Sequence, residues 1–242
     1  MSLKPESPPP GPTRVVNRLI GSLPRQDARR MEALCEAVDL VPGSVLCEAN
    51  ELLEHAYFPL TGFISLVTPM AGHEPLETEH IGSEGMLGVT LALDIPFAPQ
   101  RGLVQGAGSA LRMTAGQLRS ATHDSPALLR LLRRYLYVVM VQLSRTTGCA
   151  RFHEVEARLA RGLLMIHDRA HADHFHQTHQ SLADMLGVQR GAVTIAAGHL
   201  QQKGAIHYSR GKITIADRKV LEGESCSCYA AVAADYARLL PG

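Results

Sequence analysis

The side chains best suited to chemistry in this sequence lie between Thr178 and Ile215. Thr178 is a natural helix N-cap, and apolar residues at helical spacing follow it as far as Gly187, which ends the helix and permits a turn. A second apolar stripe then runs to Lys203. Two short helices joined by a glycine turn predict a helix–turn–helix, a motif whose second helix reaches the edges of DNA bases with its first turn.

Three polar residues near the start of that second helix are the candidate base readers. Arg190 lies on the side away from the apolar Val193, and arginine is the usual bidentate partner of guanine O6 and N7. Gln189 and Thr194 are the other exposed candidates. Short helix pairs with a glycine turn also occur in enzymes, so this pattern alone leaves both classes of protein open.

A hairpin is expected directly after these helices. Apolar and polar residues alternate on both sides of the turn at Ser209–Lys212, which predicts two short strands. A hairpin after a helix–turn–helix makes a winged helix. Arg210 and Lys212 lie in its turn, and we expect them, together with Thr178, to position the domain on DNA phosphates.

Two other groups of residues could ligate a metal. Five histidines fall between His167 and His179, and two of them, His167 and His171, are spaced i,i+4. They lack cysteine or carboxylate partners at a clear spacing, so a polar linker is the simpler interpretation. Cys226 and Cys228 form a C-x-C pair rather than C-x-x-C, which favours packing of a C-terminal tail. The sequence predicts no catalytic set and no metal site, and the role of both groups stays open.

The elements that must position these residues change character along the chain. Residues 17–40 have helical spacing, whereas residues 40–113 consist of short apolar runs, such as Leu87–Leu93, separated by glycine and proline. Such runs predict a small β-barrel or sandwich. Ser125 and Pro126 are a good start signal for a long helix, and a second amphipathic helix follows from Val155.

The long helix carries an apolar stripe with heptad-like spacing. A helix of this kind either packs on its own domain or pairs with a second copy of the chain, and the residues leave both possibilities open. If the helix pairs, its contact residues are Leu128, Leu132, Tyr135, Val139 and Gln142.

Composition and charge exclude several classes of protein. The chain has 242 residues, 45% of them hydrophobic, which is ordinary for one large or two modest globular domains. Its apolar runs are too short to span a membrane, its N-terminus lacks a signal-peptide pattern, and its five cysteines are scattered. We therefore expect a cytoplasmic protein with no membrane partner. Residues 1–124 carry 9 Lys and Arg against 14 Asp and Glu, whereas residues 125–221 carry 14 against 6, so the back half suits a polyanion.

From Asn17 to Tyr229 the chain resembles the Crp/Fnr family of bacterial transcription regulators. Three segments, residues 41–46, 57–67 and 81–88, are similar to parts of the family's cyclic-nucleotide-binding β-roll. The helix from Ser125 resembles its dimerisation helix, and Leu182–Lys203 resembles its helix–turn–helix. The resemblance implies a homodimer that binds a palindromic operator in double-stranded DNA, with RNA polymerase as a further partner if the protein activates transcription.

Departures from the family pattern bear on the effector. The family's cyclic-AMP cassette has Gly-Glu near its start and Arg-Ser or Arg-Thr about ten residues on. Here Glu84 is followed by Gly85 and Met86, and the best-aligned arginine, Arg101, comes 17 residues after Glu84. These four residues mark the candidate effector pocket, and their pattern argues against cyclic AMP. A regulator that retains cyclic AMP or cyclic GMP binding, and an interaction module that does not bind DNA, remain the alternatives.

Two more departures concern the DNA reader and metal cofactors. Gly191 and Ile195 replace a glutamate and an arginine of the cyclic-AMP-type recognition helix, so the operator should differ. The N-terminus has no cysteine before Cys35, so no iron–sulfur cluster is expected.

The sequence thus predicts an α+β protein that is a transcription regulator and not an enzyme. Its fold would be an N-terminal β-roll (a jelly-roll-like double-stranded β-helix), a long dimerisation helix and a C-terminal winged helix–turn–helix. The expected divisions are a disordered arm at 1–16, an effector domain at 17–124, the dimerisation helix at 125–150, a DNA-binding domain at 151–230 and a tail at 231–242.

Overall fold

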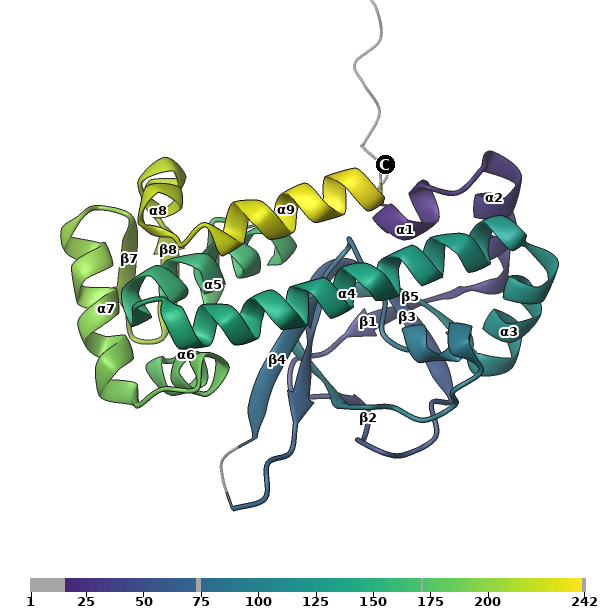
Figure 1. Cartoon of the computed structure of the whole chain (residues 1–242), viewed down its shortest axis with the longest axis horizontal. Coiled ribbons are helices and arrows are strands. Elements are labelled where there is room, and N and C mark those ends of the chain that lie inside the picture. The colour runs from purple at the N-terminus through teal and green to yellow at the C-terminus, as the bar shows by residue number, and fades with distance from the viewer. Residues whose placement is uncertain (1–15, 73–74, 171, 241–242) are drawn as a thin grey trace, which may run out of the picture.

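The computed structural model describes residues 16–72, 75–170 and 172–240. They form an N-terminal sheet domain and a smaller C-terminal domain, and the long helix α4 runs beside both (Figure 1). The predicted fold class is confirmed: an antiparallel sheet and long helices are followed by a helix–turn–helix with a hairpin. The expected arm at 1–16 lies outside the described residues except for its last position.

The N-terminal domain is built on an antiparallel sheet with the strand order β1-β5-β3-β4, and β2 pairs with β5. Its long strands β3 and β5 pair along most of their length with several register shifts. A side chain at Gly108 would place its Cβ 2.2 Å from the carbonyl oxygen of Thr61, so the close approach of these strands requires glycine. The elements are α1 (Arg18–Gly21), α2 (Arg25–Leu34), β1 (Glu36–Leu40), β2 (Val45–Cys47), β3 (His55–Thr68), β4 (Leu76–Ile81) and β5 (Arg101–Thr114).

One apolar run expected as a strand is helical instead. Residues Val89–Leu93 form the 3₁₀ helix η1, which is bounded by Gly88 and Asp94, both with left-handed backbone angles. The two left-handed residues turn the chain away from extended geometry on either side of the run. Leu91 and Ala92 are nevertheless buried, so the run still contributes to the core.

Two helices follow the sheet. They are α3 (Ala115–Asp124) and α4 (Pro126–Phe152). Ser125 separates them and caps α4, because its side chain accepts a hydrogen bond of 3.1 Å from the backbone N–H of Leu128. Pro126 occupies the first helical position, as the sequence predicted.

The structure corrects the expected dimerisation stripe on α4. Leu128, Leu132 and Tyr135 are buried in the chain's own core together with residues of the sheet domain, and Val139 packs against that core. Gln142 is also buried and donates a short hydrogen bond to Glu79 on β4. The apolar face of α4 therefore covers its own domain, because a helix beside an open sheet face buries its apolar stripe there first.

The C-terminal domain packs four helices and a small sheet around one core. Strand order in this sheet is β6-β8-β7. Leu163, Val193, Leu200 and Ile213 are fully buried at its centre. Its elements are α5 (Val155–Ala170), β6 (His174–His176), α6 (His179–Leu186), α7 (Arg190–Gln202), β7 (Ile206–Ser209), β8 (Lys212–Ile215) and α8 (Arg218–Glu224).

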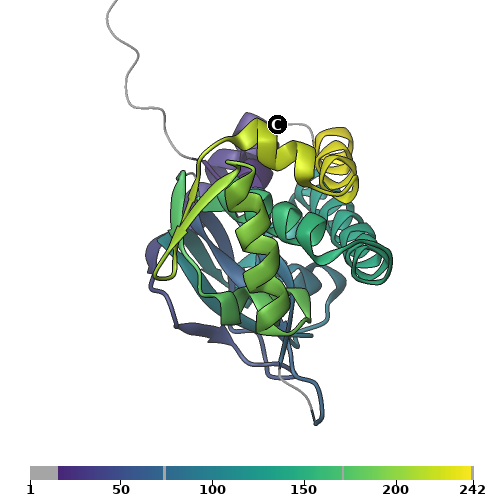
Figure 2. The same cartoon turned by 90° about the vertical axis from the view of Figure 1, so that its left-hand side faces the viewer.

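The last part of the chain that the structure describes is a helix, where a tail at 231–242 was expected. Helix α9 (Cys228–Leu239) returns along α4 towards α1, and both views show it beside α4 (Figures 1 and 2). Val232, Tyr236 and Leu240 join the core of the sheet domain. The Arg145 guanidinium on α4 also pairs with Asp235 on α9 at 3.0 Å. This last helix therefore ties the C-terminal domain back onto the N-terminal one.

Across the described parts of the chain, the structure contains no helix with the length and apolar character that a membrane crossing requires.

Candidate nucleic-acid interface and effector cavity

Helices α6 and α7 form the predicted helix–turn–helix. The Thr178 hydroxyl accepts a hydrogen bond of 3.0 Å from the N–H of Ser181, and Ser181 accepts one of 3.1 Å from the N–H of Thr178. This reciprocal capping fixes the start of α6. Gly187 ends the helix with φ +61°, a left-handed angle that favours glycine. Thr178 itself is exposed, so its hydroxyl lies at the surface where a phosphate would approach.

The candidate base readers lie together at the start of α7. Gln189 is the N-cap residue, and Gln189, Arg190 and Thr194 are all exposed. The Thr194 hydroxyl donates to the carbonyl oxygen of Arg190 at 3.1 Å and also lies 2.9 Å from Nδ1 of His179. The structure therefore brings the three predicted readers onto one exposed face of α7.

Two residues that sequence reasoning did not select complete this face. Ile195 on α7 is 64% exposed, and an apolar side chain in the major groove can contact a thymine methyl group. His179 stacks on Tyr208 of β7 with ring centroids 4.1 Å apart. Partial burial and the neighbouring Arg190 lower the pKa of His179, which favours the neutral ring. The sequence signal that could have selected Ile195 is its apolar side chain, because exposed positions of a helix are normally polar.

The wing is the hairpin of β7 and β8. Arg210 and Gly211 both have positive φ, +47° and +82°, which makes the tight turn that the sequence predicted. Arg210 and Lys212 are exposed at this turn. Helix α7 and the hairpin lie at the same end of the molecule, which faces the viewer in Figure 2. The cationic residues of the hairpin and the candidate base readers on α7 can therefore contact the same DNA duplex.

The histidines between His167 and His179 do not converge. Nε2 of His167 lies 2.9 Å from a carboxylate oxygen of Asp173, whereas His174 and His176 lie on β6. His171 is outside the described residues. Among the residues that the structure does describe, these histidines form no metal-binding group.

The residues predicted to form the effector pocket do not form one site. The Arg101 guanidinium on β5 pairs with Glu48 at 3.4 Å, whereas Glu84 pairs with Arg169 of α5 at 2.8 Å. Glu84 and Arg101 thus have different partners. Gly85 lies so close to the Tyr135 hydroxyl that a side chain would not fit.

A different set of residues lines a cavity of about 350 Å³ between the sheet and α4. Its walls are mostly apolar and include Leu66, Ile81, Val139 and Met86, the one residue of the predicted set that lines this cavity. No lysine or arginine of the described chain lines it. The cavity therefore suits an apolar ligand better than an anion.

Glu79 is the ionisable group at the wall of this cavity. It is fully buried, and loss of solvation raises its pKa to about 8 despite the nearby Arg169. Arg169 lies 3.9 Å from Glu79 but only 2.8 Å from Glu84, so Glu84 compensates most of its charge. The second carboxylate oxygen of Glu79 has no hydrogen-bond partner among the described residues. Burial therefore favours the protonated form of Glu79 at neutral pH.

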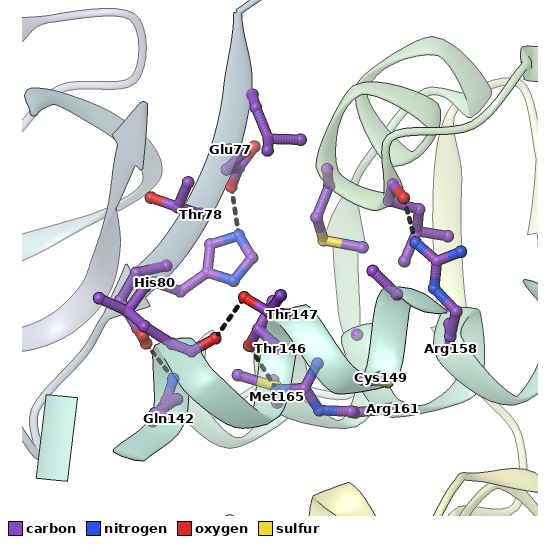
Figure 3. Close-up of a pocket in the computed structure, with 17 residues that line it drawn as sticks. Glu77, Thr78, His80, Gln142, Thr146, Thr147, Cys149, Arg158, Arg161 and Met165 are labelled. Carbon is purple, nitrogen blue, oxygen red and sulfur yellow. Dashed lines mark hydrogen bonds and ion pairs between the residues drawn. The ribbon is translucent and has the colours of Figure 1, made fainter. Parts of the chain in front are cut away.

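A second cavity of about 300 Å³ lies between the two domains (Figure 3). His80 and Glu77 form a short ion pair on its β4 side. On the opposite side, Arg158 donates a short hydrogen bond to the carbonyl oxygen of Leu186. Figure 3 also shows Arg161 reaching from α5 to the Thr146 hydroxyl, 3.1 Å away. Movement of the C-terminal domain would reshape this cavity.

Comparison with known families tests the interpretation of the DNA-binding half. A family described as the Crp-like helix–turn–helix domain matches residues 157–224. The chain carries a Crp-like helix–turn–helix domain. This match extends from α5 to the end of α8, so α9 lies outside the Crp-like domain.

Solved structures share the fold over most of the chain. FixK2 from Bradyrhizobium japonicum has a TM-score of 0.68 at 15% identity and covers 80% of this chain and 98% of its own. A Crp/Fnr-family regulator from Thermus thermophilus has a TM-score of 0.64 at 22% identity, covering 78% and 98%. The c-di-GMP-responsive regulator CLP of Xanthomonas campestris has a TM-score of 0.64 at 16% identity, covering 79% and 99%. No curated protein sequence matches the chain.

The Crp-like domain and the shared fold confirm the predicted resemblance to the Crp/Fnr family. The matched structures from Thermus thermophilus and Xanthomonas campestris are described as regulators, which agrees with the function class that the sequence predicted.

Proposed function

We propose that the chain is a homodimeric regulator that reads a palindromic operator with the first turn of α7. The exposed cluster of Gln189, Arg190 and Thr194 is the observation that carries this proposal. Arg190 contacts a guanine, Gln189 and Thr194 contact neighbouring bases, and Arg210, Lys212 and Thr178 contact phosphates. In a dimer on DNA, the two α7 helices lie one helical turn apart, about 34 Å.

The proposal is tested by titrating the purified chain with duplex DNA from its own upstream region at several salt concentrations. Specific binding should weaken steeply with salt, and Lys212→Ala should lower affinity for all sequences and flatten the salt slope by about one per protomer. The control is Arg25→Ala, which removes an exposed cation of α2 in the other domain and should leave the slope as it is. An unchanged slope for Lys212→Ala would argue against the wing contact.

The dimer contact that best fits the structure is the exposed side of α4. Tyr137 and Met140 are 53% and 60% exposed on this helix, although both are large and apolar. They follow one another at helical spacing on the face that the sheet domain does not cover. Pairing of two α4 helices through this face replaces the contact that the sequence predicted.

The sheet domain, in our proposal, responds to an uncharged apolar ligand rather than to a cyclic nucleotide. A cyclic phosphate needs a cation, and the cavity beside α4 offers the protonated Glu79 instead. The neutral dye Nile red should bind this cavity, and Val139→Trp, which fills it, should abolish the fluorescence gain. Calorimetric binding of cyclic AMP or cyclic GMP to the full chain would support the cyclic-nucleotide alternative and contradict the proposal.

A further inference from the structure

Four ligand-type side chains from distant parts of the chain meet between the two domains. Cys149, His153, Cys226 and Cys228 each offer one ligand atom, and these atoms all lie within 4.8 Å of one another. Sγ of Cys149 is 3.5 Å from Sγ of Cys226, and Sγ of Cys228 is 3.7 Å from Nδ1 of His153. Cys149 and Cys226 are buried, and the other two are partly buried.

Local structure holds both halves of this cluster in place. Cys149 and His153 are spaced i,i+4 at the C-terminal end of α4, and the N–H of His153 donates to the carbonyl oxygen of Cys149 at 3.1 Å. Cys226 and Cys228 flank Ser227, the N-cap residue of α9. The N–H of Cys226 also donates to the carbonyl oxygen of Ala157 at the start of α5, at 3.4 Å. The backbone therefore orients all four side chains before any ligand binds.

The separations fit one tetrahedral metal ion. When Zn–S bonds are about 2.3 Å long, two sulfur ligands of a tetrahedral zinc lie about 3.8 Å from each other. A sulfur ligand and a nitrogen ligand lie slightly closer together. The distances of 3.5 Å and 3.7 Å are close to these values. A cluster of several iron atoms would spread its ligands more widely. Three cysteines and one histidine form one of the usual ligand sets of structural zinc.

The surroundings suit bound thiolates. Arg161 is buried, and its charge interacts with Cys149 and Cys228 of this cluster. Nε of Arg161 has no hydrogen-bond partner among the described residues. Zinc with three thiolates and a neutral histidine has one net negative charge, which this guanidinium balances.

We propose that Cys149, His153, Cys226 and Cys228 bind a zinc ion that fastens the start of α9 to the end of α4. The ion joins the long helix, which leaves the sheet domain, to the segment that closes the DNA-binding domain. Loss of zinc would free α9 from α4 at the point where it begins. The site thereby makes the relative position of the two domains depend on zinc and on the oxidation state of the thiols.

The test measures metal in the full chain, purified without oxygen or chelators from cells supplied with zinc. Mass spectrometry of the metal content should find about one zinc per chain. Cobalt substitution should give the intense visible bands of a tetrahedral cobalt thiolate. Cys228→Ser and His153→Gln, which alter the two more accessible ligands, should each weaken zinc binding by at least about tenfold in a chelator competition. Cys35→Ser and Cys47→Ser are the matched controls and should bind as the wild type does.

Thermal unfolding with and without chelator distinguishes loss of zinc binding from failure of a variant to fold. Chelator should lower the Tm of the wild type and both controls, and it should have little effect on Cys228→Ser. Three results would overturn the proposal: less than about a tenth of a zinc per chain, an iron–sulfur spectrum, or a Cys149–Cys226 disulfide in the anaerobically purified protein with unchanged Tm after chelation.

Discussion

Arg190 lies exposed on the first turn of α7, where a guanidinium can meet the edge of a base. We expect Arg190→Ala to cost about 1–3 kcal/mol of specific binding and to relax sequence preference at one position of each half-site. Binding competition between the preferred operator and singly substituted operators measures this change. Uniform weakening across all operators would instead assign Arg190 to a phosphate.

Glu79 should make stability depend on pH. Burial raises its pKa from 4.5 to about 8, so the folded protein binds a proton that the unfolded chain releases at lower pH. The stability that this proton contributes is complete below pH 4.5 and is lost as pH rises to about 8 and beyond. Glu79→Gln should remove this part of the pH dependence.

Urea unfolding of the wild type and Glu79→Gln across this pH range is the measurement. The difference between the two proteins should grow in favour of Glu79→Gln as the pH rises. The control is Glu51→Gln, because Glu51 is exposed. A wild type whose stability increases over the same range relative to Glu79→Gln would show that Glu79 is ionised and paired with Arg169.

Among the elements, α4 illustrates what a sequence pattern leaves undecided. The heptad-like stripe predicted a helix with one long apolar face, and α4 has one. The pattern did not say which partner covers this face, since a sheet and a second helix both bury an apolar stripe. Packing on the sheet leaves Tyr137 and Met140 exposed, and neither belonged to the stripe.

Two substitutions on the exposed face of α4 test the proposed dimer contact. Tyr137→Glu and Met140→Glu should each weaken the dimer by about tenfold or more, because a charge would be buried at the helix contact. Light scattering during gel filtration over a range of concentrations measures the change. Leu93→Glu, at an exposed apolar residue of η1, is the control. Dimers of normal affinity in both α4 variants would place the interface elsewhere.

Helix α9 should contribute substantially to stability. Tyr236 is nearly buried against the core that includes Leu19 and Tyr135. Replacing it by alanine removes most of this packing, so Tyr236→Ala should cost about 3 kcal/mol. Phe97→Ala, at an exposed aromatic residue, should cost less than about 0.5 kcal/mol. Chemical denaturation measures both, and equal small costs would mean that α9 is only loosely attached.

For the whole molecule, the sequence predicted features that depend on neighbouring residues, but it did not predict contacts between residues far apart in the chain. The caps at Thr178 and Ser125, the turn at Gly187 and the hairpin at Arg210 depend on neighbouring residues, and the sequence predicted all four. The proposed zinc ligands were not found, because 72 residues separate His153 from the next of them, Cys226. The C-x-C pair was visible, but its partners on α4 were not.

The cavity beside α4 was not predicted for a similar reason, because its residues lie far apart in the sequence. Glu84 was assigned to a ligand pocket from its place in a motif, whereas folding pairs it with Arg169, 85 residues further along. The cavity beside α4 is assembled from strands, η1 and one helix, and its residues share no sequence pattern.

The buried pairing of Arg169 with Glu84 has a consequence for evolution and engineering. Arg169 lies within the Crp-like segment, but it is buried against the sheet domain. Grafting this segment onto another sensor would leave a cation without its acidic partner, and grafting without α9 would also strip the apolar cover from α4. The halves of this protein are therefore not interchangeable modules. A working chimera must carry Glu84, Arg169 and α9 together as a single inherited unit.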